Sequence, residues 1–239
     1  PCNAAYQSTV DAVTAAGALL VVAAGNAGAQ VTRPADCRGV LAVTAVRGDG
    51  AKASYGSYGP TVGLAAPGGS GFGGTDDGIY TTLNDGRRGP TTFSYGPMVG
   101  TSFSAPLASG VAALVLSIQP GLSGAAVSSL LVGHVRSHTR QANLATCSAQ
   151  SISQGACNCT TQTCGSGLLD VDLALAAAQS SLPTVPVTPP VPTTPANPTT
   201  PSSEGGGGAM GGLWGAALWL WLWAVRRSQI RSKPAASCP

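Results

Sequence analysis

Charged side chains are scarce in this sequence. Only 9% of its 239 residues are Asp, Glu, Lys or Arg, against about 25% in typical soluble proteins, while 44% are hydrophobic. A solvated disordered chain is excluded, because such chains combine high charge with few apolar residues. The net charge of +3 depends on four basic residues among the last fourteen, and residues 1–204 hold 8 basic and 9 acidic side chains. A basic face for phosphates, and hence a nucleic-acid partner, is not expected.

The sequence also lacks an initiator methionine and a signal peptide. It begins at Pro1 and runs through Cys2 directly into an expected helix. We therefore expect the chain to be the C-terminal portion of a longer protein, with part of its chemistry upstream. Histidine is rare as well, since only His134 and His138 occur.

Composition divides the chain into three zones. Residues 1–182 are apolar and glycine-rich and are the expected globular domain. Residues 183–204 contain 8 of the 18 prolines, interleaved with Thr and Val, and predict an extended polyproline II linker. Residues 205–239 hold a glycine patch, an apolar run and a basic tail.

The apolar run, residues 209–225, begins at Ala209, ends at Val225 and contains all four tryptophans but no charge. At about 1.5 Å per residue it would span roughly 26 Å, near the lower limit for a transmembrane helix. A buried helix of a globular domain is the alternative, but behind the linker the run has no core to join. Arg226 and Arg227 would stay cytoplasmic and place residues 1–182 outside. We expect an exported protein, secreted or at the cell surface, with a C-terminal membrane anchor.

Apolar runs within residues 1–182 predict a mixture of helices and strands. Helices are expected over residues 4–18, 103–119, 123–135 and 171–179, and strands over residues 19–24, 40–46, 62–66 and, more weakly, 79–83. The strands lack polar alternation, which indicates burial on both faces and therefore an α/β fold with a mostly parallel sheet. Residues 103–119 are apolar nearly all round and stop at Pro120, which predicts a central buried helix.

Six cysteines fall in the globular zone, and their even number in an exported layout favours disulfides. They are Cys2, Cys37, Cys147, Cys157, Cys159 and Cys164. Cys2 and Cys37 are the expected pair, and the other four allow three connectivities, of which a Cys157–Cys159 bridge is disfavoured by its tight loop. A zinc site on the last three is the alternative, disfavoured by an oxidising compartment and by the absence of a Cys-x-x-Cys spacing. Cys238, beyond the membrane run, should be unpaired.

The most specific string is Gly-Thr-Ser-Phe-Ser-Ala-Pro, residues 100–106, which leads into the expected central helix. Ser102 would lie close to unpaired backbone N–H groups and the positive end of the helix dipole, which suit a developing oxyanion. Gly100 removes a side chain where a substrate carbonyl would approach, and Pro106 is tolerated in a first turn. An ordinary serine N-cap is the commoner explanation of such a residue.

Asn26 follows a buried strand, in the string Val-Val-Ala-Ala-Gly-Asn. It is expected at the carboxyl edge of a parallel sheet, where open α/β folds place their sites. Its side-chain N–H could be a second oxyanion donor, a group typically worth about 3 to 4 kcal/mol in a transition state. The alternative is a turn residue in a Gly-Asn-Ala-Gly loop.

With these strings the chain resembles the C-terminal half of subtilisin-like serine peptidases, specifically the extracellular bacterial branch with added disulfides. Matching strings run in order through about 180 residues: 24–26, 34–37, 40–46, 53–55, 58–59, 65–68, 100–106 and 164–167. The resemblance implies a three-layer subtilisin-like fold without its N-terminal part, and a serine endopeptidase acting on extracellular proteins or peptides. No cofactor is expected for the chemistry. The family often carries structural calcium, but no acidic constellation here allows one to be assigned.

By this resemblance Ser102 is the nucleophile, and Asn26 forms the oxyanion hole with the Ser102 backbone N–H. Other residues would line the pocket for the substrate residue before the scissile bond or flank the nucleophile: Ala23, Ala24 and Gly25 in the pocket wall, Gly100 and Thr101 beside the serine. The family's catalytic Asp and His precede the oxyanion Asn and are expected upstream of Pro1. Neither His134 nor His138 fits that order, so the chain alone is expected to be inactive.

Two other functions remain open at this point. One is a catalytically inactive binding or adhesion module of the same fold, which would require loss of the upstream His or Asp. The other is a different serine hydrolase, such as an esterase, although the sequence has no Gly-x-Ser-x-Gly elbow.

The tail carries a second resemblance. The order of glycine patch, short apolar helix and arginine pair is similar to the GlyGly type of C-terminal sorting tail. This implies a rhomboid-type intramembrane protease as a partner and an anchor that is later removed. A permanent single-span anchor is the alternative.

Overall fold

The computed structural model describes residues 1–71, 78–86, 88–148 and 155–181. The chain divides into two units, Pro1–Val185 and Pro186–Pro239, and every described residue belongs to the first. The predicted linker at 183–204, the apolar run at 209–225 and Cys238 therefore lie outside the described residues.

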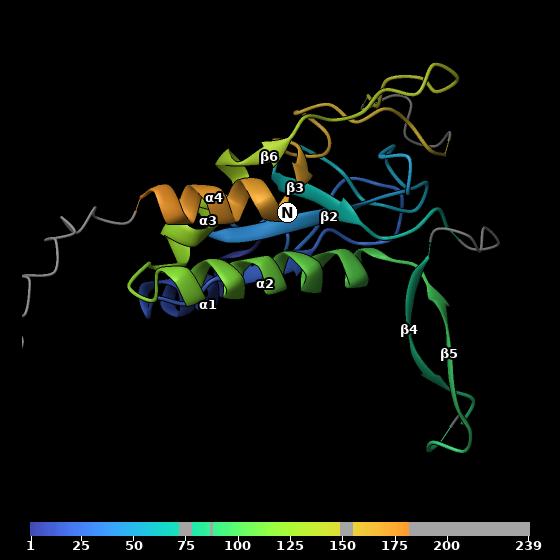
Figure 1. The fold of residues 1–239 in the computed structure, drawn as a ribbon, viewed down its shortest axis with the longest axis horizontal. Coiled ribbons are helices and arrows are strands. Elements are labelled where there is room, and N and C mark those ends of the chain that lie inside the picture. The colour runs from blue at the N-terminus through green and yellow to red at the C-terminus, as the bar shows by residue number, and fades with distance from the viewer. Residues whose placement is uncertain (72–77, 87, 149–154, 182–239) are drawn as a thin grey trace, which may run out of the picture. The chain divides into compact units, whose positions relative to one another are not determined.

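A mostly parallel five-stranded sheet forms the centre of the first unit, in the order β1-β2-β3-β7-β6 (Figure 1). Its strands are β1 (Leu20–Ala23), β2 (Val40–Val46), β3 (Val62–Pro67), β6 (Val135–Arg136) and β7 (Leu168–Leu169). All neighbours pair in parallel except β6, which runs antiparallel to β7. The α/β fold expected from uninterrupted apolar strands is thus confirmed. The two-residue strands β6 and β7 are too short to leave a sequence pattern.

Four helices accompany the sheet, and polar caps set where three of them begin. They are α1 (Ala4–Ala15), α2 (Thr101–Ile118), α3 (Gly124–Gly133) and α4 (Val171–Ser180). The side chains of Asn3, Ser123 and Asp170 each accept a hydrogen bond from a first-turn backbone N–H. The expectation that the first helix continues to residue 18 was wrong. It ends at Ala15, because Gly17 adopts a left-handed φ of +90°.

The main core lies between the sheet and α2, which crosses β1, β2 and β3. Alternate side chains of β2 and β3 point toward α2, and residues of α3 and α4 complete this cluster. Its strand members are Leu41, Val43, Leu64 and Ala66, and its α2 members include Ala108, Val111, Ala112 and Val115. α2 is also the helix in the described ranges that is long and apolar enough to span a membrane, with a mean hydropathy of 1.6. One face of α2 packs on the sheet, but only 39% of this apolar stretch is buried and Leu107 and Leu114 are exposed, so the expected central buried helix is covered on one side only.

A two-stranded antiparallel hairpin projects away from this body (Figure 1). It comprises β4 (Ile79–Asn84) and β5 (Phe93–Met98), paired over six residues on each side. β4 corresponds to the weak strand expected over residues 79–83. β5 was not expected, because Gly96 and Pro97 interrupt its pattern and both residues are depleted in strands.

Three disulfides link the six cysteines of the described unit: Cys2–Cys37, Cys147–Cys157 and Cys159–Cys164. The first is the expected pair, and the other two are one of the three connectivities left open. The sulfurs that the zinc alternative would need are all paired. The Cys2–Cys37 bridge joins the start of α1 to the segment before β2, while the other two hold a loop against the sheet, where Cys159 and Cys164 pack on Val46 and Ala65.

Lys52 is a fully buried cation beside this loop. Its Nζ donates hydrogen bonds to the backbone oxygens of Ala53 and Gly56, at 2.8 Å and 2.7 Å, and lies 5.8 Å from the centre of the Tyr58 ring. Its backbone N–H donates to the oxygen of Cys157 at 2.9 Å. Burial lowers the pKa of Lys52 from 10.5 to about 8, because the charged amine loses water.

This lowered pKa predicts that stability rises with pH above 8. Between pH 8 and 10.5 the unfolded chain binds a proton at Lys52 that the folded chain has released, so alkali favours the folded state. Relative to a Lys52→Met variant, the free energy of unfolding should rise by up to about 3 kcal/mol over this interval. Urea unfolding of the full-length protein and of its Lys52→Met variant at pH 7 to 10.5 measures it. Parallel pH profiles for the two proteins would contradict the prediction.

Candidate active site

The carboxyl end of β1 and the amino end of α2 are locked together by one asparagine and one threonine. The Oδ1 of Asn26 accepts hydrogen bonds from the Thr101 backbone N–H at 3.0 Å and from the Thr101 hydroxyl at 2.8 Å. The same hydroxyl accepts from the Gly25 N–H at 3.2 Å. Residues 75 positions apart thereby become neighbours, and Ser102, in the first turn of α2, lies exposed beside them.

Two nitrogen atoms that can donate hydrogen bonds, Asn26 Nδ2 and the Ser102 backbone nitrogen, lie near the same point beside Gly100. Because Thr101 occupies Oδ1, the Asn26 amide is oriented with Nδ2 free to face outward. A β-carbon built on Gly100 would lie 3.3 Å from Asn26 Nδ2 and 3.7 Å from the Ser102 nitrogen. Gly100 also has a φ of +145°, which other residues rarely adopt. Glycine at this position therefore keeps open a small space between a side-chain donor and a backbone donor, at the positive end of a helix.

The turn that carries Ser102 is hydrogen-bonded to a buried tyrosine. The Gly100 N–H donates to the Gly68 oxygen and to the Tyr55 hydroxyl, each at 3.0 Å. That hydroxyl also lies 2.5 Å from the Gly68 oxygen and 3.0 Å from the Gly69 oxygen. Two residues after Ser102, the buried Ser104 hydroxyl contacts the Ala66 and Pro67 oxygens at 3.2 Å and 3.1 Å. The start of α2 is thus fixed to the end of β3.

The expected pocket wall lies directly beside this turn. Ala23 ends β1, Ala24 is buried, and Gly25 follows with a φ of +109°. The Gly25 oxygen accepts from the Ser57 N–H at 2.8 Å, and a β-carbon on Gly25 would lie 3.1 Å from the Ser57 hydroxyl. Small residues therefore lie beside the turn that carries Ser102, where the Gly25 N–H donates to the Thr101 hydroxyl.

Neither histidine is part of this arrangement. His134 caps the end of α3, and its Nδ1 lies 2.9 Å from the oxygen of Leu130 in the same helix. His138 places Nε2 2.9 Å from the oxygen of Gly165, which packs against Gly63 near the amino end of β3. Asn26 and Ser102 lie at the opposite, carboxyl end of the strands. Within the described ranges, no side chain hydrogen-bonds to the Ser102 hydroxyl.

Three residues that support the site could not be predicted from the sequence, namely Tyr55, Ser57 and Ser104. All three lie in or beside the strings that carried the resemblance. Their roles cannot be predicted from these strings. A hydroxyl side chain in an apolar string resembles an ordinary core residue until its hydrogen-bond partners, which are distant in sequence, are known.

Metal ligands do not gather at this place. The two clusters of candidate ligands among the described residues are Cys147 with Cys159 and Cys164, and Cys2 with Asp36 and Cys37. Every cysteine in them belongs to a disulfide, which removes the thiolates that a metal would need.

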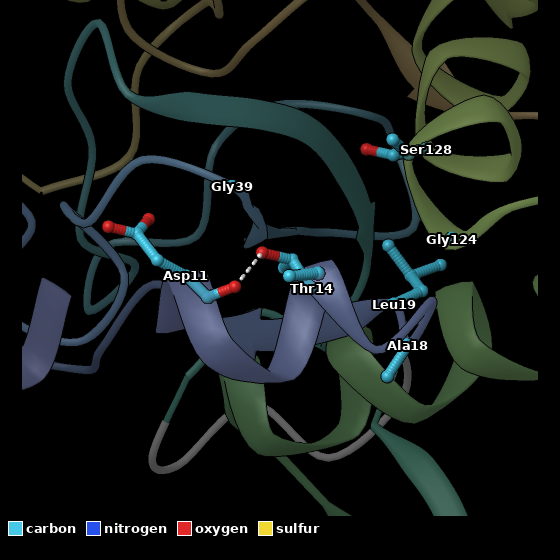
Figure 2. A pocket seen from close by; sticks show the side chains of 9 residues that line it. Asp11, Thr14, Ala18, Leu19, Gly39, Gly124 and Ser128 are labelled. Carbon is cyan, nitrogen blue, oxygen red and sulfur yellow. Dashed lines mark hydrogen bonds between the residues drawn. The ribbon is translucent and has the colours of Figure 1, made fainter. Parts of the chain in front are cut away.

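A separate open pocket of about 370 Å³ lies between α1 and α3 (Figure 2). It is lined by Asp11, Thr14, Ala15, Ala18, Leu19, Gly39, Gly124, Ala125 and Ser128. Leu19 precedes β1, so this pocket is at the amino end of the strand whose carboxyl end leads to Asn26. The Thr14 hydroxyl donates a hydrogen bond to the Asp11 backbone oxygen at 3.2 Å. The pocket is therefore not part of the Asn26–Ser102 arrangement.

Comparison with known proteins identifies the family of this chain. The sequence profile of the subtilase family matches residues 2–156. An extracellular protease of Xanthomonas campestris pv. campestris is 36% identical over 180 residues, covering 74% of this chain and 27% of the relative. An extracellular basic protease of Dichelobacter nodosus is 42% identical over 118 residues, covering 48% of this chain and 18% of the relative.

The fold is similar to solved structures as well. A protease from Pseudoalteromonas arctica PAMC 21717 superposes with a TM-score of 0.62 at 32% identity, covering 74% of this chain and 48% of that one. The chain thus spans less than a third of the two curated relatives and about half of this solved structure.

Proposed function

The chain belongs to the subtilase family, and on that premise we propose that it is the C-terminal part of a serine endopeptidase domain in which Ser102 is the nucleophile. One observation carries the proposal: Asn26 Nδ2 and the Ser102 N–H converge on the space that Gly100 leaves open, beside an exposed serine hydroxyl. Two preorganised donors around such a space are what an acyl-transfer oxyanion requires.

In the proposed mechanism the Ser102 hydroxyl attacks the scissile carbonyl and gives its proton to a histidine upstream of this chain, which an upstream aspartate orients. The carbonyl oxygen becomes negative and accepts hydrogen bonds from Asn26 Nδ2 and the Ser102 N–H. The C–N bond then breaks, the histidine returns the proton to the leaving amine, and Ser102 is left acylated. Water, deprotonated by the same histidine, attacks the acyl carbon. The bond to the Ser102 oxygen breaks, the histidine returns the proton to that oxygen, and the acid leaves. Side chains and backbone supply all of these steps, so the chemistry requires no cofactor.

Two surfaces support the proposal that the upstream half completes the domain. Among the described strands β1 is at the sheet edge, with one side unpaired. On α2 the apolar side chains of Leu107 and Leu114 are exposed to solvent. An unpaired parallel edge and an apolar helix face beside the nucleophile are suitable places for the segment that carries the base.

We also propose secretion followed by attachment to the cell surface. The extracellular relatives and the three disulfides support export. Residues 209–225 would anchor the protein in the membrane, and a rhomboid-type protease would remove them. Mass spectrometry of the mature C-terminus from membrane and medium fractions tests this: a surface form still carrying residues 209–239 would show a permanent anchor.

The direct test uses the full-length protein, exported from a host with an oxidising compartment. A fluorophosphonate probe should label Ser102, identified by mass spectrometry of the modified peptide, because the probe reacts only with a base-activated serine. Activity on a peptide amide, beyond that on the matching ester, would then separate a peptidase from an esterase. A folded protein that is not labelled would instead fit an inactive binding module.

The tyrosine beneath the nucleophile turn offers a further prediction. Tyr55→Phe removes only the hydroxyl that accepts from the Gly100 N–H, so the turn and the Ser102 N–H should lose alignment in the transition state. The hydroxyl's contacts with the Gly68 and Gly69 oxygens are lost as well. We expect kcat on a peptide amide to fall about tenfold or more with KM unchanged, since the loss of each hydrogen bond of about 1.4 kcal/mol corresponds to a factor of ten. Tyr58→Phe, which changes the neighbouring tyrosine outside the turn, is the matched control. A rise in KM at constant kcat, or a loss explained by lower thermal stability alone, would contradict a positioning role.

A further inference from the structure

The aromatic residues of the β4–β5 hairpin lie on its solvent-exposed face. Residues directly opposite in an antiparallel pair share a face, as do alternate residues along one strand. The register therefore places Tyr80, Thr82 and Asn84 together with Pro97, Tyr95 and Phe93. All six are exposed, and Tyr80, Phe93 and Tyr95 keep 72%, 83% and 69% of their surface accessible.

The opposite face of the same hairpin is the more covered one. Ile79, Thr81 and Leu83 are half-buried there, and Gly96 is buried. Leu83 lies over Gly96, where a β-carbon would come within 2.8 Å of its Cδ1. Ser94 and Met98, on the same face, are exposed. The two faces therefore differ in degree, since three side chains are half-buried on this one and none on the other. We call the six exposed residues the aromatic face.

The hairpin leads directly into the candidate site. β5 ends at Met98, and Val99 packs against the cluster that contains Tyr55. Gly100, held by Tyr55 and Gly68, and Ser102 come next. The base of the hairpin therefore adjoins the start of α2, where Ser102 lies, and the hairpin extends outward from there (Figure 1).

The chemistry of this face fits an extended polypeptide. None of its six residues is charged, and the segment that joins β4 to β5 contains Asp85, Arg87 and Arg88 in the sequence. An extended peptide presents alternate side chains about 7 Å apart on one side, which is also the spacing of Phe93, Tyr95 and Pro97 along β5. Within the described residues the outer edges of β4 and β5 are unpaired and offer backbone donors and acceptors.

We propose that the aromatic face is an accessory binding surface for unfolded segments of the protein substrate, outside the residues that flank the cleaved bond. The proposal rests on the peptidase function proposed above. Three aromatic side chains can bury about 150–250 Å² each, enough to retain an apolar segment while its neighbouring bond enters the site. Protein substrates should benefit from this contact, whereas peptides of a few residues should not reach it.

The test compares two substrates for the full-length enzyme and for a variant carrying Tyr80→Ser, Phe93→Ser and Tyr95→Ser. For reduced, unfolded casein, kcat/KM should fall about tenfold through a higher KM, as expected when central aromatic contacts are lost. For a short chromogenic peptide amide, kcat/KM should stay within about twofold. A matched control, Val171→Ser with Leu173→Ser, removes two exposed apolar side chains from α4 and should change neither value.

Other outcomes overturn the proposal in distinguishable ways. An equal fall with both substrates would mean that the hairpin only supports the site, and no fall with either would mean that no substrate docks there. If the substitutions instead abolish binding to phospholipid vesicles, or dissociate a dimer in gel filtration, the face belongs to a membrane or to a second copy. A parent enzyme inactive on the short peptide contradicts the proposed function itself. Anisotropy of labelled casein with the Ser102→Ala protein, with and without the triple change, provides a readout independent of turnover.

Discussion

Replacing Ser102 by alanine in the full-length protein should lower kcat on a peptide amide by at least about 10⁴-fold. The substitution removes the atom that attacks the carbonyl and leaves the two oxyanion donors in place, so a small residual rate and near-normal substrate binding are expected. The side chain is exposed, so its loss should leave the thermal unfolding temperature almost unchanged. Initial rates by chromogenic assay, with calorimetry of the same preparation, measure both effects.

Ser109→Ala is the matched control, because Ser109 is another exposed serine on α2 and its hydroxyl contacts only the Ala105 oxygen of its own helix. It should retain parental activity. A Ser102→Ala enzyme that hydrolyses peptide at the parental rate would contradict the assignment of the nucleophile and, with it, the proposed function.

Asn26→Ala should lower kcat by about 10²- to 10³-fold with little change in KM, as for the loss of one oxyanion donor. The donor Nδ2 contacts the carbonyl oxygen only when that oxygen becomes negative, so ground-state binding does not depend on it. Steady-state kinetics on a peptide amide separate kcat from KM. A comparable rise in KM at constant kcat would show that Asn26 binds the substrate in its ground state.

The same side chain also accepts two hydrogen bonds from Thr101, so loss of structure must be separated from loss of a donor. Asn26→Asp retains an oxygen for Thr101 but replaces the donor with an acceptor that repels an oxyanion. It should be at least as impaired as Asn26→Ala. Recovery of activity in Asn26→Asp would mean that the contact with Thr101, rather than the donor, is what catalysis requires.

Much of the fold could be predicted because its central elements are uninterrupted apolar runs. The range expected for β2 matches the structure, and β1 and β3 differ by one residue at their ends. Helix starts were predictable within about two residues where a capping side chain occurs, as at Ser123. β5 could not be predicted, because its glycine and proline are more typical of turns than of strands. Pairing with β4 is what stabilises it.

The site could be predicted where chemistry requires one residue type and not where it depends on distant contacts. Ser102 and Asn26 stand out in their strings, since the nucleophile and the amide donor that we propose for them have few substitutes. Tyr55 does not, because its hydroxyl acquires a role only when Gly100, 45 residues later, folds over it. Lys52 is similar: nothing in its neighbours shows that the amine will be buried and satisfied by backbone oxygens.

The three disulfides determine when the proposed peptidase could complete its fold and cleave proteins of the cell that makes it. Bonds of this kind do not persist in a reducing cytoplasm, where glutathione and thioredoxin keep thiols reduced. Until the chain is exported, the loop beside Lys52 and the segment joining α1 to β2 would lack their covalent ties. A newly made chain would therefore be least able to hold its site together while surrounded by the cell's own proteins. Export would therefore precede disulfide formation, and oxidation would complete the fold only outside the cytoplasm.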